Sequence, residues 1–236
     1  MPEAAREPLL LLPGLLCDAG LWPAQVAGLA DVADCQVADL GGADTFPALA
    51  REVLAAAPAR FALAGFSFGG YVAQEILRQA PQRVSRLALL DTGYRPDTPE
   101  RAAERRSAQR MASFGGEFLG ITGPLMRTFI APARLGDQAL VGTIEAMTRR
   151  VGRAVFLRQN AMPRVDGEAV LRALRVPTLV LAGEFDVRTP PALAREMAAL
   201  IPGAELVIIP GSGHMSPLEQ PAAVTTALRR WLGRAV

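Results

Sequence analysis

Short apolar runs alternate with longer amphipathic segments along the chain. Each apolar run ends at or near a Gly or Pro, and the six runs are Leu9–Leu12, Gln36–Ala38, Arg60–Ala64, Leu87–Leu90, Thr178–Ala182 and Leu206–Ile209. Such short, bounded runs are typical of strands buried on both faces of a parallel sheet. Helical periodicity, or a Pro near the first turn, marks four other segments: Pro47–Ala57, Phe68–Gln79, Pro190–Leu200 and Pro217–Leu232. The alternation predicts an α/β fold with a parallel sheet.

The alternation stops between Tyr94 and Arg164. This stretch has no buried-strand pattern and contains twelve Arg against six Asp or Glu, a local charge of +6 that leaves −4 for the rest of a chain whose total is +2. We interpret residues 95–164 as a helical lid, inserted into a core made of residues 1–94 and 165–236.

Composition narrows the chemistry. The chain has 236 residues, of which 50% are apolar and 20% charged, as in an ordinary globular protein. All 25 basic residues are Arg, which excludes lysine Schiff bases and the phosphate-loop lysine. The one histidine, His214, excludes metal sites that need two histidines. We expect a soluble, cytoplasmic protein that uses no metal or cofactor and binds neither nucleic acid nor a membrane.

Gly65-Phe66-Ser67-Phe68-Gly69 has the pattern G-x-S-x-G, directly after one apolar run and directly before a helical segment. In this nucleophile-elbow pattern a sharp strand-to-helix turn projects the serine hydroxyl, and small residues avoid collisions at the turn. We therefore take Ser67 as the candidate nucleophile rather than as an inert turn residue.

A serine hydroxyl needs a base, and the base needs a carboxylate to orient it. His214 is the candidate base, because its Gly-rich loop follows the last apolar run. Asp186, in the turn after Thr178–Ala182, is the preferred acid. Glu184 and Asp91 stay open as alternatives, since each also follows a strand.

The backbone amides of Leu15 and Phe68 are the candidate oxyanion donors, with Leu16 as the alternative to Leu15. Phe68 begins the helix after Ser67, where amides lack partners, and the other donor should come from the loop after the first strand. In that region Cys17 is expected to be a buried, unreactive thiol and Trp22 a core residue.

Together these segments resemble the α/β-hydrolase family, most closely its small capped esterases, lactonases and carrier-protein methyl-ester hydrolases. The resemblance rests on four segments: Leu10–Asp18, Gly65–Gly70, Gly183–Asp186 and Gly211–Glu219. The order Ser67, Asp186, His214 is also the family order. The resemblance implies a three-layer α/β-hydrolase fold with an inserted helical lid. Two departures are the missing N-terminal strand hairpin, which implies about six parallel strands, and Pro13-Gly14 where the family has His-Gly.

The resemblance implies acyl transfer, because a serine at position 67 argues against the haloalkane dehalogenases and epoxide hydrolases of the family. The main hypothesis is a cofactor-free serine hydrolase that cleaves a small carboxylic ester, thioester or lactone. Carbon–carbon hydrolysis and perhydrolysis are the enzymatic alternatives, and a ligand sensor on the same fold is the non-enzymatic one.

The Arg-rich lid has two interpretations. It attracts an anionic partner, such as a coenzyme A thioester or an acyl carrier protein, or it is a solvated surface whose arginines pair with Glu100 and Glu104. The apolar face of the lid is predicted to comprise Phe114, Phe118, Met126, Phe129, Met147, Phe156 and Met162.

Overall fold

The computed structural model describes residues 6–235 and contains one six-stranded, all-parallel sheet. The strands are β1 (Glu7–Leu12), β2 (Ala33–Val37), β3 (Phe61–Phe66), β4 (Val84–Leu90), β5 (Thr178–Gly183) and β6 (Glu205–Ile209). Their order in the sheet is β2-β1-β3-β4-β5-β6. The six-stranded parallel sheet predicted from the apolar runs is therefore confirmed, with β2 beginning three residues earlier than expected.

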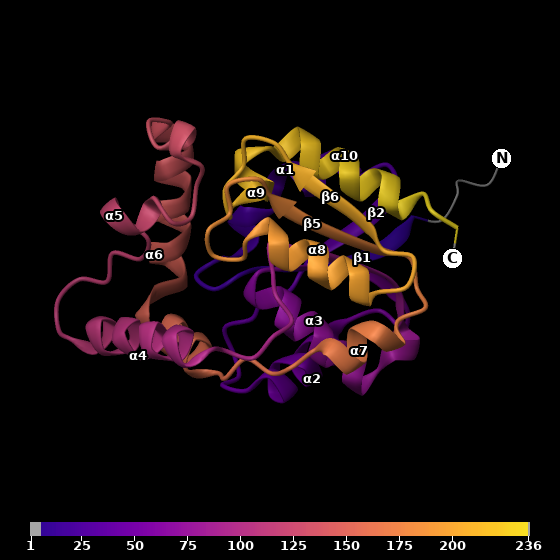
Figure 1. Cartoon of the computed structure of the whole chain (residues 1–236), viewed down its shortest axis with the longest axis horizontal. Coiled ribbons are helices and arrows are strands. Elements are labelled where there is room, and N and C mark those ends of the chain that lie inside the picture. The colour runs from indigo at the N-terminus through magenta and orange to yellow at the C-terminus, as the bar shows by residue number, and fades with distance from the viewer. Residues whose placement is uncertain (1–5, 236) are drawn as a thin grey trace.

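Helices cover both faces of the sheet. The α-helices outside the insertion are α1 (Pro23–Leu29), α2 (Phe46–Ala56), α3 (Phe68–Gln79), α7 (Glu168–Ala173), α8 (Pro191–Leu200), α9 (Ser216–Glu219) and α10 (Pro221–Leu232). Figure 1 shows α1 and α10 on one face, and α2, α3 and α8 on the other. Because successive strand residues point to opposite faces, Leu9 and Leu11 pack in one apolar cluster, and Leu10 and Leu12 pack in the other.

The insertion lies between β4 and β5, as predicted. It contains α4 (Pro99–Ser113), α5 (Gly123–Met126) and α6 (Gln138–Ala161). Figure 1 shows these helices at the end of the sheet toward which the arrowheads of β5 and β6 point. Short 3-10 helices span Ala19–Leu21, Pro81–Arg83 and Pro132–Arg134. The lid therefore sits over the carboxyl ends of the strands, where α/β proteins carry their sites.

Three details differ from the sequence prediction. The last helix is interrupted at Gln220, because Pro221 cannot donate to the preceding turn and its ring would collide with a carbonyl there. The short helices α1 and α7 were not predicted. Phe114 is 73% exposed rather than part of the apolar face, because the chain turns into extended backbone there, just after α4.

The other predicted apolar residues of the lid are buried or half-buried. Cys17 and Trp22 are buried as expected. Burial raises the pKa of the Cys17 thiol to about 12, so the thiol stays protonated at neutral pH. No helix within residues 6–235 is both long enough and apolar enough to cross a bilayer.

Candidate active site

Ser67 occupies a strained turn between β3 and α3. Its φ is +50°, in a region that side chains rarely adopt. A Cβ on Gly65 would lie 2.6 Å from the carbonyl oxygen of Gly69, and a Cβ on Gly69 would lie 2.5 Å from the carbonyl oxygen of Leu12. Both positions therefore require glycine. The turn is held on its other side by Thr92, whose hydroxyl donates to the Ser67 carbonyl oxygen at 2.6 Å.

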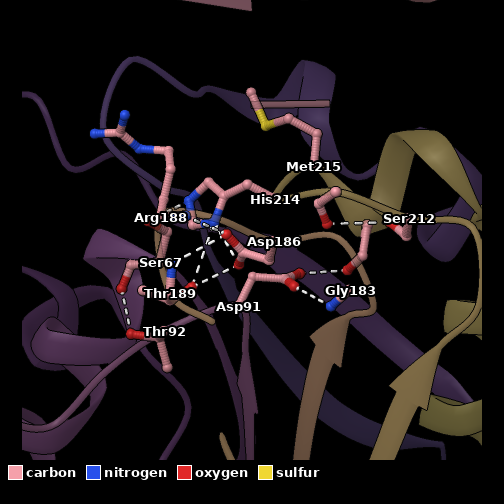
Figure 2. A network of polar contacts seen from close by, with 12 residues as sticks. Ser67, Asp91, Thr92, Gly183, Asp186, Arg188, Thr189, Ser212, His214 and Met215 are labelled. Atoms are coloured by element: carbon pink, nitrogen blue, oxygen red, sulfur yellow. Dashed lines mark hydrogen bonds and ion pairs between the residues drawn. The ribbon is translucent and has the colours of Figure 1, made fainter. Parts of the chain in front are cut away.

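A continuous polar chain joins three side chains from three separate loops. Ser67 Oγ lies 2.9 Å from His214 Nε2, and His214 Nδ1 lies 2.8 Å from Asp186 Oδ2 (Figure 2). His214 and Asp186 are each only 3% exposed. The geometry suits proton transfer from the serine hydroxyl to the imidazole, with the carboxylate fixing the ring tautomer.

Asp186 is held as an ionised acceptor. Its Oδ1 accepts hydrogen bonds from the backbone amides of Arg188 at 2.8 Å and Thr189 at 3.0 Å. Its Oδ2 accepts one from the Thr189 hydroxyl at 2.6 Å. Burial by itself raises the pKa of Asp186, but the charge of His214 and the hydrogen bonds from His214 and Thr189 outweigh it, so the pKa falls below its ordinary value.

The two alternative acids contact other groups. Asp91 Oδ1 accepts a hydrogen bond from the amide of Gly183 at 2.7 Å (Figure 2), and its other oxygen accepts one from the Ser216 hydroxyl. Glu184 is exposed and accepts from the amide of Gly211 at 2.9 Å. Of the three carboxylates considered, Asp186 is the one hydrogen-bonded to His214.

Asp91 is fully buried beside this chain of contacts. Burial, and then the nearby charge of Asp186, raise the pKa of Asp91 well above its ordinary value. Such a shift favours the protonated carboxyl. In that form the contact with Ser216 can reverse, with the carboxyl donating and the Ser216 hydroxyl accepting, while the other oxygen still accepts from the Gly183 amide. Asp91 therefore links the end of β4 to Gly183 at the end of β5 and to Ser216.

Glu219 holds the loop that carries His214. Its carboxylate accepts hydrogen bonds from three backbone amides: Ala131 at 2.7 Å, Gly213 at 3.0 Å and Met215 at 3.1 Å. The amide of His214 itself donates to the carbonyl oxygen of Phe129 at 2.8 Å. The base loop is thus fastened to the lid segment at Phe129 and Ala131.

The two candidate oxyanion amides face the same space. Within residues 6–235, neither the Leu15 nor the Phe68 amide donates to a protein acceptor. Both residues line a recess of about 80 Å³ together with Ser67 and His214. Leu16, the alternative donor, has a φ of +61° and is not among the residues that line this recess. This arrangement favours Leu15 and Phe68 for stabilising negative charge next to Ser67.

A cavity of about 560 Å³ opens above Ser67 and His214. Its apolar lining comes mainly from the lid and includes Ala108, Ile121, Leu125, Phe129 and Phe156. The rest of its lining is rich in Arg. A volume of this size accommodates a small organic molecule, with its reactive bond placed beside Ser67.

The sequence prediction named Ser67, His214, Asp186, Leu15 and Phe68, and the structure brings all five residues to one place. It did not identify Thr189 or Glu219 as site residues. A hydroxyl three residues after the candidate acid was a signal that could have identified Thr189. Glu219 had no such signal, because its amide partners lie partly in the lid.

Comparison with known proteins agrees with this fold. A family model described as the alpha/beta hydrolase family matches residues 9–227. The chain belongs to the alpha/beta hydrolase family.

Three relatives illustrate the range of similar proteins. BpoC of Mycobacterium tuberculosis, which carries the name of a non-heme bromoperoxidase, is 31% identical over 76% of this chain and 70% of its own. A thermophilic esterase from Thermogutta terrifontis, solved with malate bound, is 30% identical with a TM-score of 0.83, covering 96% of this chain and 89% of its own. A pimeloyl-(acyl-carrier protein) methyl ester esterase of Vibrio campbellii is 25% identical over 94% of this chain and 93% of its own.

Proposed function

We propose that this hydrolase is a serine esterase that cleaves a small carboxylic ester through an acyl-enzyme. The observation that carries the proposal is the contact chain from Ser67 through His214 to Asp186, with distances of 2.9 and 2.8 Å, beneath a cavity. The similarity to the Thermogutta terrifontis esterase gives independent support.

In the proposed reaction, Ser67 Oγ attacks the ester carbonyl carbon while His214 Nε2 accepts the hydroxyl proton. The carbonyl oxygen becomes negative and is stabilised by the amides of Leu15 and Phe68. His214 then gives its proton to the leaving alcohol, and an acyl ester on Ser67 remains. Water, deprotonated by His214, hydrolyses that ester and releases the acid. Asp186 keeps Nδ1 of His214 protonated throughout.

Hydrolysis of p-nitrophenyl esters of increasing acyl length tests the proposal, with wild type and Ser67→Ala measured in parallel. Sustained turnover is expected in wild type, with a loss of about 10⁴-fold or more in Ser67→Ala. A fluorophosphonate should label wild type at Ser67 with one equivalent. Turnover by Ser67→Ala at the wild-type rate would contradict the proposal, whereas labelling of Ser67 without any turnover would favour a ligand sensor.

Perhydrolysis, a reaction with hydrogen peroxide, is a second candidate. It is favoured by the 31% identity to BpoC, because BpoC carries the name of a peroxidase. Hydrogen peroxide in place of water would attack the acyl-enzyme and yield a peracid, with Ser67 regenerated. Peracid formation from acetate or an acetate ester plus peroxide, lost in Ser67→Ala, would support this candidate.

An acyl carrier protein as partner stays a prediction; its support is the 25% identity to the Vibrio campbellii esterase.

A further inference from the structure

The wall of the cavity above Ser67 carries an excess of positively charged side chains. Two carboxylates line the cavity, those of Asp97 and Glu104. Five arginines line it: Arg95, Arg101, Arg105, Arg164 and Arg188. The cavity therefore has more positive than negative groups in its wall.

Three of the five arginines have carboxylate partners. The pairs are Arg95 with Glu196 at 2.8 Å, Arg101 with Glu104 at 3.3 Å and Arg105 with Asp97 at 3.0 Å. Arg164 and Arg188 differ: among residues 6–235, no carboxylate oxygen lies within 4.0 Å of either guanidinium. The excess charge of the cavity is therefore located on these two side chains.

Arg164 lies where the lid returns to the core. Its guanidinium packs 5.1 Å from the ring centre of Phe68 and 5.6 Å from that of Tyr71, and its Nη1 donates to the carbonyl oxygen of Met162 at 2.8 Å. Its Nε and Nη2 have no hydrogen-bond acceptor in the part of the chain that the structure describes. Burial lowers the pKa of Arg164 to about 10, so the guanidinium remains charged at neutral pH.

Arg188 lies two residues after Asp186. Its guanidinium stacks 4.2 Å from the ring centre of Phe129, and its Nη1 approaches the Thr128 hydroxyl at 3.3 Å. Figure 2 shows the side chain extending away from the pair formed by Asp186 and His214. Arg164 and Arg188 both line the recess of about 80 Å³ at Ser67. Both also line the larger cavity, so an anion bound there, beside the recess, can approach both guanidinium groups.

Arg164 and Arg188 are both half-buried. A guanidinium that loses part of its water is stabilised by an anion or by a set of hydrogen-bond acceptors. A planar carboxylate matches the paired N–H donors of arginine. We propose that the substrate is an ester that carries a carboxylate group, and that Arg164 and Arg188 bind this carboxylate while the ester carbonyl lies at Ser67. The inference rests on the proposed esterase function, and it names the substrate class of that site.

Matched pairs of esters test this specificity. Monoethyl succinate, glutarate and adipate carry a terminal carboxylate, and ethyl butanoate, pentanoate and hexanoate carry a methyl group in its place. Acid release is followed in a pH-stat with wild type, Arg164→Gln, Arg188→Gln and the charge-retaining Arg164→Lys. Each Gln variant is expected to lower kcat/KM for the acidic esters by about 10- to 100-fold, as the loss of a charged hydrogen bond predicts, and to change the neutral esters less than about threefold. Arg164→Lys should recover part of the loss.

Arg149→Gln is the matched control. Arg149 is an exposed residue of α6 in the same lid, and its replacement removes the same charge without changing the cavity lining. It should leave the difference between acidic and neutral esters unchanged. If Arg149→Gln lowers kcat/KM for acidic esters as much as Arg164→Gln does, general attraction by the basic lid accounts for the preference, and the inference fails.

Two further results separate this inference from the proposed function. If neutral esters are hydrolysed and Ser67→Ala abolishes the reaction, but Arg164→Gln and Arg188→Gln affect both ester series equally, the esterase stands and the carboxylate site is wrong. If neither series is hydrolysed, the proposed function fails first. Should a Gln variant not fold, inhibition of wild type by adipate, compared with neutral hexanamide, serves instead. The inference expects adipate to compete at lower concentration, and equal inhibition would overturn it.

Discussion

The carboxylate of Glu219 accepts a hydrogen bond from the backbone amide of Gly213 at 3.0 Å, and so holds the residue that precedes His214. The same carboxylate accepts from the amide of Ala131 in the lid at 2.7 Å. One buried side chain thereby couples the position of the candidate base to the wall of the cavity. The activity is consequently expected to depend on a residue that does not touch the substrate.

Glu219→Gln tests this positioning role. All the groups that face the carboxylate are donors, so the amide nitrogen of Gln would leave at least one of them without an acceptor. We expect the free energy of unfolding to fall by about 1–3 kcal/mol and kcat to fall at least about tenfold, with KM changed less. Glu184→Gln is the control, because exposed Glu184 accepts one amide of the same loop. A wild-type kcat in Glu219→Gln would contradict the positioning role.

Asp91→Asn is expected to stabilise the protein at neutral pH and to preserve most of the activity. The side-chain oxygen of Asn can accept from the Gly183 amide, and its NH₂ group can donate to the oxygen of Ser216, whose hydroxyl can also accept. Because the folded-state pKa of Asp91 is raised, the folded protein binds more protons than the unfolded chain does. Wild type therefore loses stability as pH rises above the ordinary pKa of aspartate toward the raised one. The Tm advantage of the variant should grow between pH 4 and 8, and an advantage that is flat or shrinks with pH would refute this.

Asp186→Asn should behave oppositely. The folded-state pKa of Asp186 is lowered, so its charge contributes stability above the ordinary pKa, and this contribution is lost as pH falls through the lowered pKa. We expect the variant to lose about 10⁴-fold in kcat, since Asn cannot hold the same tautomer of His214. Comparison of ester turnover by Asp186→Asn and Asp91→Asn decides which acid supports His214. A larger loss in Asp91→Asn would reverse the assignment.

Thr189→Val should remove a hydrogen bond to Asp186 without unfolding the site. Its hydroxyl donates to Asp186 Oδ2 at 2.6 Å, and valine has nearly the same shape without the donor. Loss of that hydrogen bond should raise the pKa of Asp186 and lower kcat by about 3- to 10-fold. Thr189→Ser retains the donor and should keep nearly full activity. Equal losses in the two variants would point to packing rather than hydrogen bonding.

Gly65→Ala should disrupt the turn at Ser67. The added Cβ would meet the backbone oxygen of Gly69 at 2.6 Å, which a side-chain rotation cannot relieve. We expect a loss of about 1–3 kcal/mol or more in the free energy of unfolding, and slower fluorophosphonate labelling of Ser67. Gly136→Ala is the control, because a Cβ there meets nothing within 4 Å. Both are measured by thermal unfolding and labelling rate, and normal labelling in Gly65→Ala would show that the turn tolerates the extra atom.

The sequence predicted the parts of the molecule that are encoded locally. Six short apolar runs indicated the strands, and the glycines around Ser67 indicated a tight turn whose collisions the structure makes explicit. The order of the strands in the sheet and the contacts across it are not local properties. For that reason Glu219 was not identified, and Asp91 could not be separated from Asp186 by position after a strand alone. Thr189 differs, because its contact with Asp186 spans three residues and could have been expected from the sequence.

The lid shows the same limit. The number of arginines in the lid can be read from the sequence, but the role of each depends on which carboxylates lie near it in the folded structure. Arg101 pairs with Glu104, one turn away and therefore predictable, whereas Arg150 pairs with Asp18, 132 residues away. Arg164 gave no distinguishing signal, because the absence of a carboxylate partner for it among residues 6–235 becomes visible only in the folded structure.

Trapping the acyl-enzyme tests the central claim most directly. Wild type is mixed with p-nitrophenyl butanoate, quenched in acid within the first turnovers, and digested for peptide mass spectrometry. The account predicts a butanoyl group on the peptide that contains Ser67, which appears within the first turnovers and disappears as substrate is exhausted. Continued turnover with no acyl group on Ser67, or with the group on another residue, would contradict it.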